Sequence, residues 1–336
     1  MIINVDLKHT NYNIYIERGV LKKAGELINL DRKVLIVTDE GVPEEYAETV
    51  AAQCKTAVTV TVSQGEDSKS IKVYEMLLMK MLENGFTRKD AVVAVGGGVC
   101  GDLAGFVAAS FMRGVDFYNI PTTVLSQVDS SIGGKVAVNL GGIKNIVGAF
   151  YQPKAVLVDP DTLKTLPDRQ ISAGLAEAVK MAVNFDKELF ERIESQENPM
   201  DIIDGIIEGS LLIKKRVVEA DEKESGLRKV LNFGHTVGHA IESVAKGELY
   251  HGECVALGML AVCDGEVKDR VENVLESLKL PTGFKADRDA LSEAVSHDKK
   301  AGAGTTTVII CDEIGTFKMQ EETTEEIKAR MEQFFL

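Results

Sequence analysis

The feature that most constrains the fold is a short apolar run that ends in a cluster of glycines. Residues 91–95 read Ala-Val-Val-Ala-Val, and Gly96-Gly97-Gly98-Val99-Cys100-Gly101 follows directly. A continuous apolar run of this length is typical of a buried parallel strand, which is covered on both faces. Parallel strands need crossover connections, usually helices, and residues 102–111 have helical character. The segment therefore predicts an α/β domain.

Similar signals continue through the first half of the chain. Residues 1–7, 34–37 and 57–62 read as strands, and residues 70–85 have the apolar spacing of a helix. Strands that alternate with helices indicate a parallel α/β sheet.

The pattern changes near Ile171. Only two late segments, 305–311 and 316–319, look like strands. Helices are predicted over 173–185, 202–219, 234–245 and 252–268. We therefore expect a Rossmann-like α/β domain over residues 1–165 and a mainly helical domain over 166–336.

Length and charge exclude several classes of protein. The 336 residues suit two domains, and a formal net charge of −14 disfavours nucleic acid as a partner. No apolar run approaches the roughly 20 residues that span a bilayer, and residues 1–7 do not resemble a signal peptide. The five cysteines form no CxxC motif, which favours reduced thiols. We expect a cytoplasmic protein without a membrane or nucleic-acid partner.

The glycine cluster has the spacing of a nucleotide-binding turn. Gly96, Gly98 and Gly101 satisfy GxGxxG between a strand and a helix, where backbone amides can bind phosphate. The alternative is a turn that is tight for packing alone. The acid usually found about 20 residues later is missing, so Asp39, at the end of an earlier strand, becomes the candidate for the ribose. Asp39 could equally cap a helix.

Three of the five histidines lie within twenty residues of one another. His235 and His239 are spaced i, i+4 and so share one helix face, and neutral imidazole suits zinc. Spacing alone predicts these two as ligands together. Glu177 is the candidate carboxylate, because the segment around it is small and apolar. The alternative is a surface pair between Glu177 and Lys180.

Basic and small polar residues form further clusters. They lie in Gln127–Lys135, at Lys144-Asn145, at Lys214, at Arg228 and at Lys299-Lys300. Together they could bind a doubly anionic ligand, with a phosphate at one end and a carboxylate at the other.

These segments, in their order and spacing, resemble the 3-dehydroquinate synthase family of sugar-phosphate cyclases. The resemblance rests on Gly65–Ser70, Gly96–Phe106, Met112–Gly114, Pro121–Thr123, Gln127–Lys135, Lys144-Asn145, Gly174–Glu177, Arg228–His235 and His251–Glu253. It implies a lyase that uses NAD without consuming it and a divalent zinc or cobalt ion. The reaction it implies converts 3-deoxy-D-arabino-heptulosonate 7-phosphate to 3-dehydroquinate and phosphate, by transient oxidation, elimination, re-reduction and aldol closure. This is a step of the shikimate pathway to aromatic amino acids, and the family suggests a homodimer.

The resemblance also implies that the first domain binds the nucleotide and that the second binds metal and substrate, and it implies roles for individual residues. It assigns the metal to Glu177, His235 and His251, and it moves His239 to the substrate, against the prediction from spacing. Further substrate or catalytic positions are Arg113, Asp129, Lys135, Asn145, Lys180, Lys214, Arg228, Asn232 and either Lys299 or Lys300. The nucleotide positions are Asp39, Glu66, Lys69, Gly97, Gly98, Val99, Asp102, Thr122, Thr123 and Lys144.

The chain departs from the family in one loop. Leu140–Ile143 stands where the family often has His-Pro, and Val136 replaces a common threonine. These changes put the shape of the loop in doubt. Two other activities stay open: a related sugar-phosphate cyclase, and a metal-dependent polyol dehydrogenase that consumes its nicotinamide. A catalytically silent nucleotide-binding protein is disfavoured, because every matched position keeps its reactive group.

Overall fold

The computed structural model describes residues 1–297 and 305–335. The chain divides into two compact units, Met1–Leu166 and Pro167–Leu336. Lys299 and Lys300 lie outside the described residues, so the choice between them stays a prediction.

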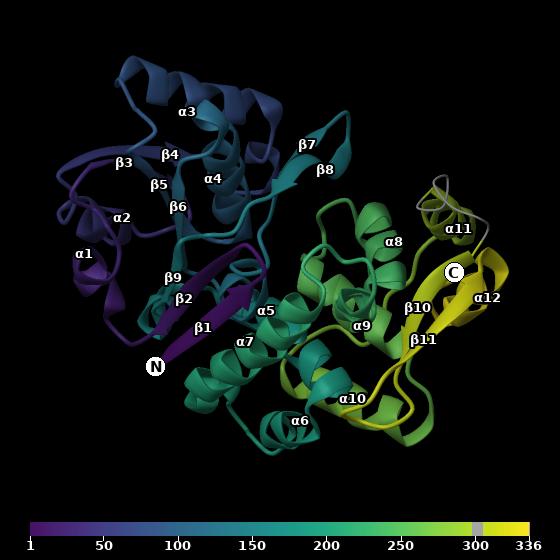
Figure 1. Ribbon diagram of the computed structural model, residues 1–336. Coiled ribbons are helices and arrows are strands. Elements are labelled where there is room, and N and C mark those ends of the chain that lie inside the picture. Colours follow the sequence, from purple (N-terminus) through teal and green to yellow (C-terminus); the bar gives the residue numbers. More distant parts are fainter. Residues whose placement is uncertain (298–304, 336) are drawn as a thin grey trace. The chain divides into compact units, whose positions relative to one another are not determined.

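The first unit is built on a seven-stranded sheet with the order β1-β2-β9-β6-β5-β3-β4 (Figure 1). Its strands are β1 Ile2–Leu7, β2 Thr10–Ile16, β3 Lys33–Asp39, β4 Thr56–Val62, β5 Ala91–Gly96, β6 Asp116–Pro121 and β9 Ala155–Val158. β1 and β2 are antiparallel, and every other neighbouring pair is parallel. The predicted parallel α/β sheet is confirmed.

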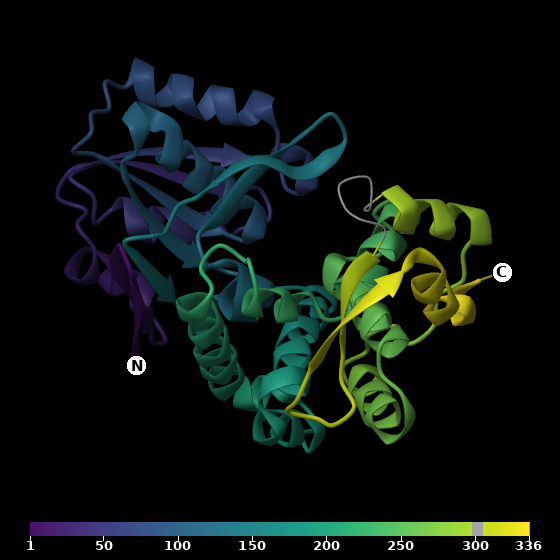
Figure 2. The same ribbon diagram turned by 45° about the vertical axis from the view of Figure 1, so that its right-hand side comes forward.

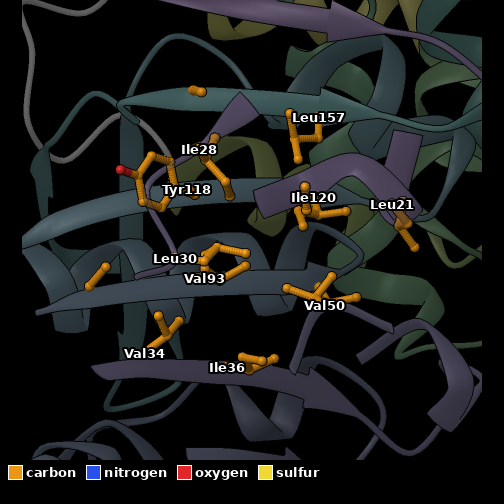
Figure 3. Close-up of a cluster of buried hydrophobic side chains, with 14 of the residues drawn as sticks. Leu21, Ile28, Leu30, Val34, Ile36, Val50, Val93, Tyr118, Ile120 and Leu157 are labelled. Atoms are coloured by element: carbon orange, nitrogen blue, oxygen red, sulfur yellow. The ribbon is translucent and has the colours of Figure 1, made fainter. Parts of the chain in front are cut away.

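Helices cover both faces of this sheet. α1 (Ala24–Leu27) and α2 (Glu44–Ala51) supply side chains to the apolar cluster on one face. Figure 3 shows that cluster, with Val50 of α2 among side chains from the strands, such as Val93 and Ile120. α3 (Ile71–Glu83) and α4 (Gly98–Ser110) pack on the other face. Burial from both sides explains why β5 is apolar at every position.

The helix after the glycine turn begins earlier than predicted. α4 starts at Gly98 rather than Asp102, so its first turn is made by the glycine cluster itself. Glycine suits position 101 because it has no Cβ. A Cβ there would lie only 3.1 Å from Nδ2 of Asn119 on β6.

A hairpin outside the main sheet was not anticipated. β7 (Lys135–Leu140) and β8 (Ile143–Phe150) are antiparallel and are joined by Gly141 and Gly142. Both glycines have positive φ, 61° and 79°, as a tight two-residue hairpin turn requires. The departure from the family at Leu140–Ile143 therefore falls on a glycine turn.

The second unit is mainly helical (Figure 2). Its helices are α5 Asp168–Phe185, α6 Lys187–Glu194, α7 Ile203–Ala220, α8 His235–Ala245, α9 His251–Ala261, α10 Gly265–Ser277, α11 Arg288–His297 and α12 Thr324–Arg330. One antiparallel strand pair, β10 (Thr305–Ile310) and β11 (Lys318–Thr323), accompanies them.

Two predictions for this unit were wrong in their boundaries. The single helix expected over 252–268 is two helices, because Cys263 leaves the helix to form a β-bridge with the distant Cys311. Gly265, with φ 54°, then starts the next helix. The late strand expected over 316–319 begins at Lys318 and runs to Thr323. Within the described ranges, no helix combines the length and the apolar character that crossing a bilayer needs.

Candidate functional site

The glycine turn of the first unit leaves its backbone open to a ligand. Gly97 precedes α4 in extended conformation, and this N-cap residue has no side chain to bind the first amides of the helix. A Cβ on Gly97 would lie 3.2 Å from Cγ2 of Thr123, and one on Gly98 would lie 3.2 Å from Oγ of Ser130. Side chains at these positions would crowd the segment 123–130, whereas glycine keeps the helix N-terminus accessible to an anion.

Asp39 lies beside this turn, although it comes much earlier in the chain. β3 and β5 are neighbours, so Asp39 ends its strand next to Gly96. Its Oδ1 accepts a hydrogen bond from Gly41 N at 2.8 Å, and Cys100 Sγ donates to Oδ2 at 3.1 Å. Burial and the Asp39 carboxylate raise the pKa of Cys100, which keeps the thiol protonated as the donor. The capping alternative is wrong, because α2 begins only at Glu44 and follows Pro43.

The segment 66–69 carries two of the expected nucleotide residues. Nζ of the buried Lys69 lies 2.5 Å from Oδ2 of Asp102 on α4. Glu66 Oε1 accepts a hydrogen bond from Asn139 Nδ2 at 2.8 Å, and Asn139 Oδ1 accepts one from Asn145 N at 2.8 Å. Asn139, which sequence reasoning missed, therefore ties this segment to the hairpin.

Two threonines follow β6 on the other side of the glycine turn. Thr122 N donates to Gly96 O at 3.0 Å, and the hydroxyl groups of Thr123 and Ser126 lie 2.8 Å apart. The strand ends thus bring Asp39, the glycines and both threonines together, with Val99 inside the first turn of α4.

The remaining expected residues of the first unit lie on turns or on the hairpin. Asp129 is in a π-helical turn, Ser126–Ser130. Lys135, Lys144 and Asn145 are exposed on β7 and β8. Arg113 is exposed on a short turn and has φ 70°, a conformation that is costly for a residue with a side chain.

In the second unit three helices bring the histidines and Glu177 together. α8 carries His235 and His239, α9 carries His251 at its first position, and α5 carries Glu177. The His235 ring centre lies 5.2 Å from that of His239 and 5.3 Å from that of His251. One ring nitrogen from each of the three histidines falls within 4.8 Å of the others.

Glu177 is buried at the centre of this group. Its side chain is 1% exposed, and its Oε1 lies 3.7 Å from His235 Nε2 and 3.5 Å from His251 Nε2. Nζ of Lys180, which is 2% exposed, forms an ion pair with Oε2. The surface-pair alternative is therefore wrong. Oε2 thus faces the ammonium of Lys180, whereas Oε1 faces the two imidazoles.

These donors fit a divalent ion. Zinc bonds to nitrogen and carboxylate oxygen are about 2.0–2.1 Å long, so two donors of a tetrahedral site lie roughly 3.3 Å apart. The separations of 3.5 Å and 3.7 Å need little adjustment. Two donor sets are available: Glu177 with His235 and His251, or the three histidines. The first set uses a buried carboxylate whose Oε1 faces Nε2 of both His235 and His251.

The surroundings keep His235 neutral and Glu177 ionised, and these are the protonation states that bind a metal ion. Burial and the ammonium of Lys180 lower the pKa of His235 to about 3, so its imidazole is neutral. Burial alone would raise the pKa of Glu177, but Lys180 and the two histidines hold it well below its usual range. Burial would also lower the pKa of His251, but the carboxylates of Glu177 and Glu242 outweigh it and raise that pKa to about 9.

Hydrogen bonds on the far side of the rings aim the Nε2 atoms at Glu177. His251 Nδ1 lies 3.1 Å from Oε2 of Glu242, and His235 Nδ1 lies 3.1 Å from the carbonyl oxygen of Phe233. Such partners orient the histidines of metal sites. Glu242 was missed, although its position seven residues after His235 puts it on the same helix face.

The other expected residues of this unit lie on α5, α7 and a turn before α8. Lys180 and Lys214 are buried lysines on α5 and α7, whereas Asn232 and His239 are exposed. Arg228 is buried, and its Nη1 donates to Glu222 O at 2.6 Å.

Asp221, also missed, organises that turn. Its carboxylate accepts hydrogen bonds from the backbone amides of Ser225, Gly226 and Arg228 at 2.9, 2.7 and 3.0 Å. Desolvation would raise the pKa of Asp221, but these bonds lower it to about 2, so the carboxylate stays ionised and the turn stays closed. An acid ahead of a polar turn is too common in sequences to have identified it.

Both halves of the chain match one known family. Residues 59–173 match the family described as 3-dehydroquinate synthase N-terminal, and residues 174–301 match 3-dehydroquinate synthase C-terminal. A 3-dehydroquinate synthase of Enterococcus faecalis is 42% identical, over 98% of this chain and 98% of its own.

Solved structures agree along nearly the whole length. A 2-deoxy-scyllo-inosose synthase, solved with carbaglucose-6-phosphate, NAD+ and Co2+, has a TM-score of 0.87 and 26% identity over 98% of this chain and 99% of its own. A 2-epi-5-epi-valiolone synthase of Streptomyces hygroscopicus, with NAD+ and Zn2+ bound, has a TM-score of 0.88 and 26% identity over 97% of both chains. From the matches to both halves and the near full-length identity of its relatives, this chain belongs to the 3-dehydroquinate synthase family.

Proposed function

We propose that this protein converts 3-deoxy-D-arabino-heptulosonate 7-phosphate to 3-dehydroquinate and inorganic phosphate, with NAD and a divalent zinc or cobalt ion. The observation that carries the proposal is the buried carboxylate of Glu177 facing Nε2 of His235 and His251, in a chain of this family. The NAD+ and the Co2+ or Zn2+ ion bound in the two solved cyclase structures support the choice of cofactors.

Each cofactor has a set of residues that suits it. Glu177, His235 and His251 would hold the ion, and the strand ends around Asp39, Lys69, Gly97, Gly98 and Thr123 would hold the nucleotide. When bound, the ion polarises a substrate oxygen and the nicotinamide accepts and later returns a hydride. Asp39 suits the ribose, because a carboxylate accepts hydrogen bonds from its hydroxyl groups.

Buried cations suit the anionic groups of the substrate. Lys180, Lys214 and Arg228 are nearly inaccessible to solvent, so their charges are weakly screened and act strongly on a bound anion. The guanidinium of Arg228 is already held by Glu222 O, and its turn is closed by Asp221. A prearranged group of this kind loses little entropy when the substrate binds.

Asn232 and His239 have a different setting, because both are exposed. We propose that they orient the departing phosphate, whose own oxygen takes the proton from the neighbouring carbon. This division leaves the protein with positioning rather than proton abstraction as its main task.

The function is tested by phosphate release from 3-deoxy-D-arabino-heptulosonate 7-phosphate, with zinc and substoichiometric NAD, while NADH absorbance is followed. Many phosphates released per NAD, with no lasting NADH, is the expected result. Phosphate release matched by accumulating NADH would contradict it. Release only from related sugar phosphates without a carboxylate would point to another cyclase.

Lys69→Ala is expected to weaken NAD binding about 10- to 100-fold, the range for losing a charge-assisted contact. The change removes a cation and also leaves Asp102 without that partner near the anion-binding turn. Calorimetric titration of the zinc-loaded protein with NAD measures the effect. Lys80→Ala is the control, because Lys80 is exposed on α3 and pairs with Glu83 three residues further on. Equal affinity in both variants would refute the role of Lys69.

We also propose that the protein is a homodimer. Ile143, Ile146 and Phe150 of β8 are 58%, 57% and 46% exposed. Within the described residues β8 pairs with β7 alone, and an open edge strand with exposed apolar side chains is normally covered. Light scattering should find twice the 36.5 kDa mass of one chain. A monomer mass at micromolar concentration would refute the proposal.

A further inference from the structure

Arg169 and Glu253 form a two-pronged ion pair between α5 and α9. Arg169 Nε lies 2.7 Å from Glu253 Oε1, and Arg169 Nη2 lies 2.8 Å from Glu253 Oε2. Arg169 Nη2 also donates to Glu248 O at 2.6 Å, and the guanidinium lies 4.5 Å from the ring centre of Tyr250. Glu253 is 6% exposed, and its Oε2 also accepts from Tyr250 N at 2.7 Å. One carboxylate therefore caps α9 and binds α5 at the same time.

The backbones of the two helices touch next to this pair. A Cβ on Gly252 would overlap the carbonyl oxygen of Ala173, so α9 can approach α5 this closely only with glycine there. The pair and the glycine contact both join the first turn of α9 to α5. Together they restrain both the separation of the helices and the rotation of α9.

These restraints act on two of the proposed metal ligands. His251 precedes Gly252 on α9, and Glu177 follows Ala173 by one helical turn on α5. The distance from Glu177 Oε1 to His251 Nε2, 3.5 Å, is close to the separation that a shared ion requires. Neither Arg169 nor Glu253 is itself among the donors.

We propose that Arg169 and Glu253 are positioning residues that hold Glu177 and His251 at the distance for metal binding. The inference rests on the metal site proposed above. A purely structural salt bridge is the competing explanation. Arg169 is half exposed, and exposed pairs contribute little to stability. The buried Glu253 and the bidentate geometry instead favour a role in orientation.

The chain offers a matched control. Arg270 and Glu194 form the same bidentate pair, at 2.9 and 2.6 Å, and Arg270 lies 5.2 Å from the ring centre of Phe190. This pair joins α6 to α10, which carry none of the proposed ligands. Arg270→Lys and Glu194→Gln therefore repeat the chemistry of Arg169→Lys and Glu253→Gln away from the metal.

The test measures zinc affinity of the metal-free, full-length proteins by competition with a chromogenic chelator, without substrate or NAD. Arg169→Lys and Glu253→Gln are expected to weaken zinc binding about 10- to 100-fold, the range for partners that orient ligands. The control variants should bind zinc as the parent does. Excess zinc should restore turnover in Arg169→Lys, which a loss of catalytic groups would not allow.

Unchanged zinc affinity in Arg169→Lys, with or without a shift in its urea midpoint, would overturn the inference. If Glu253→Gln does not fold, Arg169→Lys decides alone, because lysine keeps the charge and loses only the two-pronged geometry. Failure of the proposed function would look different. The parent would then bind zinc with the pattern above and release no phosphate.

Discussion

Replacing Glu177 with glutamine is expected to abolish stoichiometric zinc binding and to reduce phosphate release by about a thousand-fold or more. The amide keeps the volume of the side chain but removes the negative charge, the anionic donor in the preferred set. A bound ion contributes several kcal/mol to the stabilisation of developing charge, and each 1.4 kcal/mol is tenfold in rate. Zinc content after gel filtration and single-turnover phosphate release are the measurements.

The same substitution should also destabilise the second unit. Lys180 is 2% exposed and pairs with Glu177. Breaking a buried pair from one side costs about 3–5 kcal/mol, so metal content must be compared at a temperature where the variant is folded.

His239→Ala is the control that separates the two donor sets. It lies on the same helix face as His235, yet it is exposed. We expect this variant to keep its zinc and to lose rate. If His239→Ala loses zinc while Glu177→Gln keeps it, the three histidines are the ligands and the assignment of Glu177 is wrong.

Gly258→Ala is expected to destabilise the protein by about 1–3 kcal/mol, the range for overpacking a close contact. A Cβ at this position would overlap the carbonyl oxygen of Gly234 and would lie 2.8 Å from Gly238 N. Both partners are backbone atoms of the α8 segment, so no side chain can move aside. Alanine favours the helix over glycine by about 1 kcal/mol. A net loss of stability would therefore have to come from the close contact.

Gly258→Ala should also push α9 away from α8 and so weaken zinc binding, because the contact between these helices brings His235 and His251 together. Urea denaturation and zinc titration measure the two effects. Gly205→Ala on α7 is the control, since the atoms nearest to its Cβ would be the flexible end of the Arg192 side chain. Equal urea midpoints for the two variants would show that α8 and α9 are less tightly packed than described.

The sequence predicted the glycine turn between a strand and a helix, because its signals are local. An apolar strand followed by glycines predicted the turn. The acid usual about 20 residues after such a turn is absent, which left Asp39 as the candidate for the ribose. Local patterns predicted the ends of helices less accurately. Cys263 interrupts a continuous helical pattern because it pairs with Cys311, which lies far away in the chain.

The candidate metal site shows more clearly what local sequence patterns cannot predict. Helical spacing correctly put His235 and His239 on one face, but spacing within one helix cannot say which side chains of other helices face them. The apolar surroundings of Glu177 named it as the carboxylate, and the family resemblance added His251 as a ligand, but neither named Glu242 or Arg169. Those two act through contacts with residues nine and 84 positions away.

By itself the sequence determined the alternation of strands and helices in the first half, the mainly helical second half, and the residue types able to bind phosphate and metal. These follow from periodicity, from glycine at tight turns and from the chemistry of single side chains. Only the tertiary structure decided that Asp39 adjoins the glycine turn, that Glu177 is buried beside two imidazoles, and that Arg169 ties α5 to α9. Strand order and helix crossings set these proximities, because they arise from packing between segments that are distant in the chain.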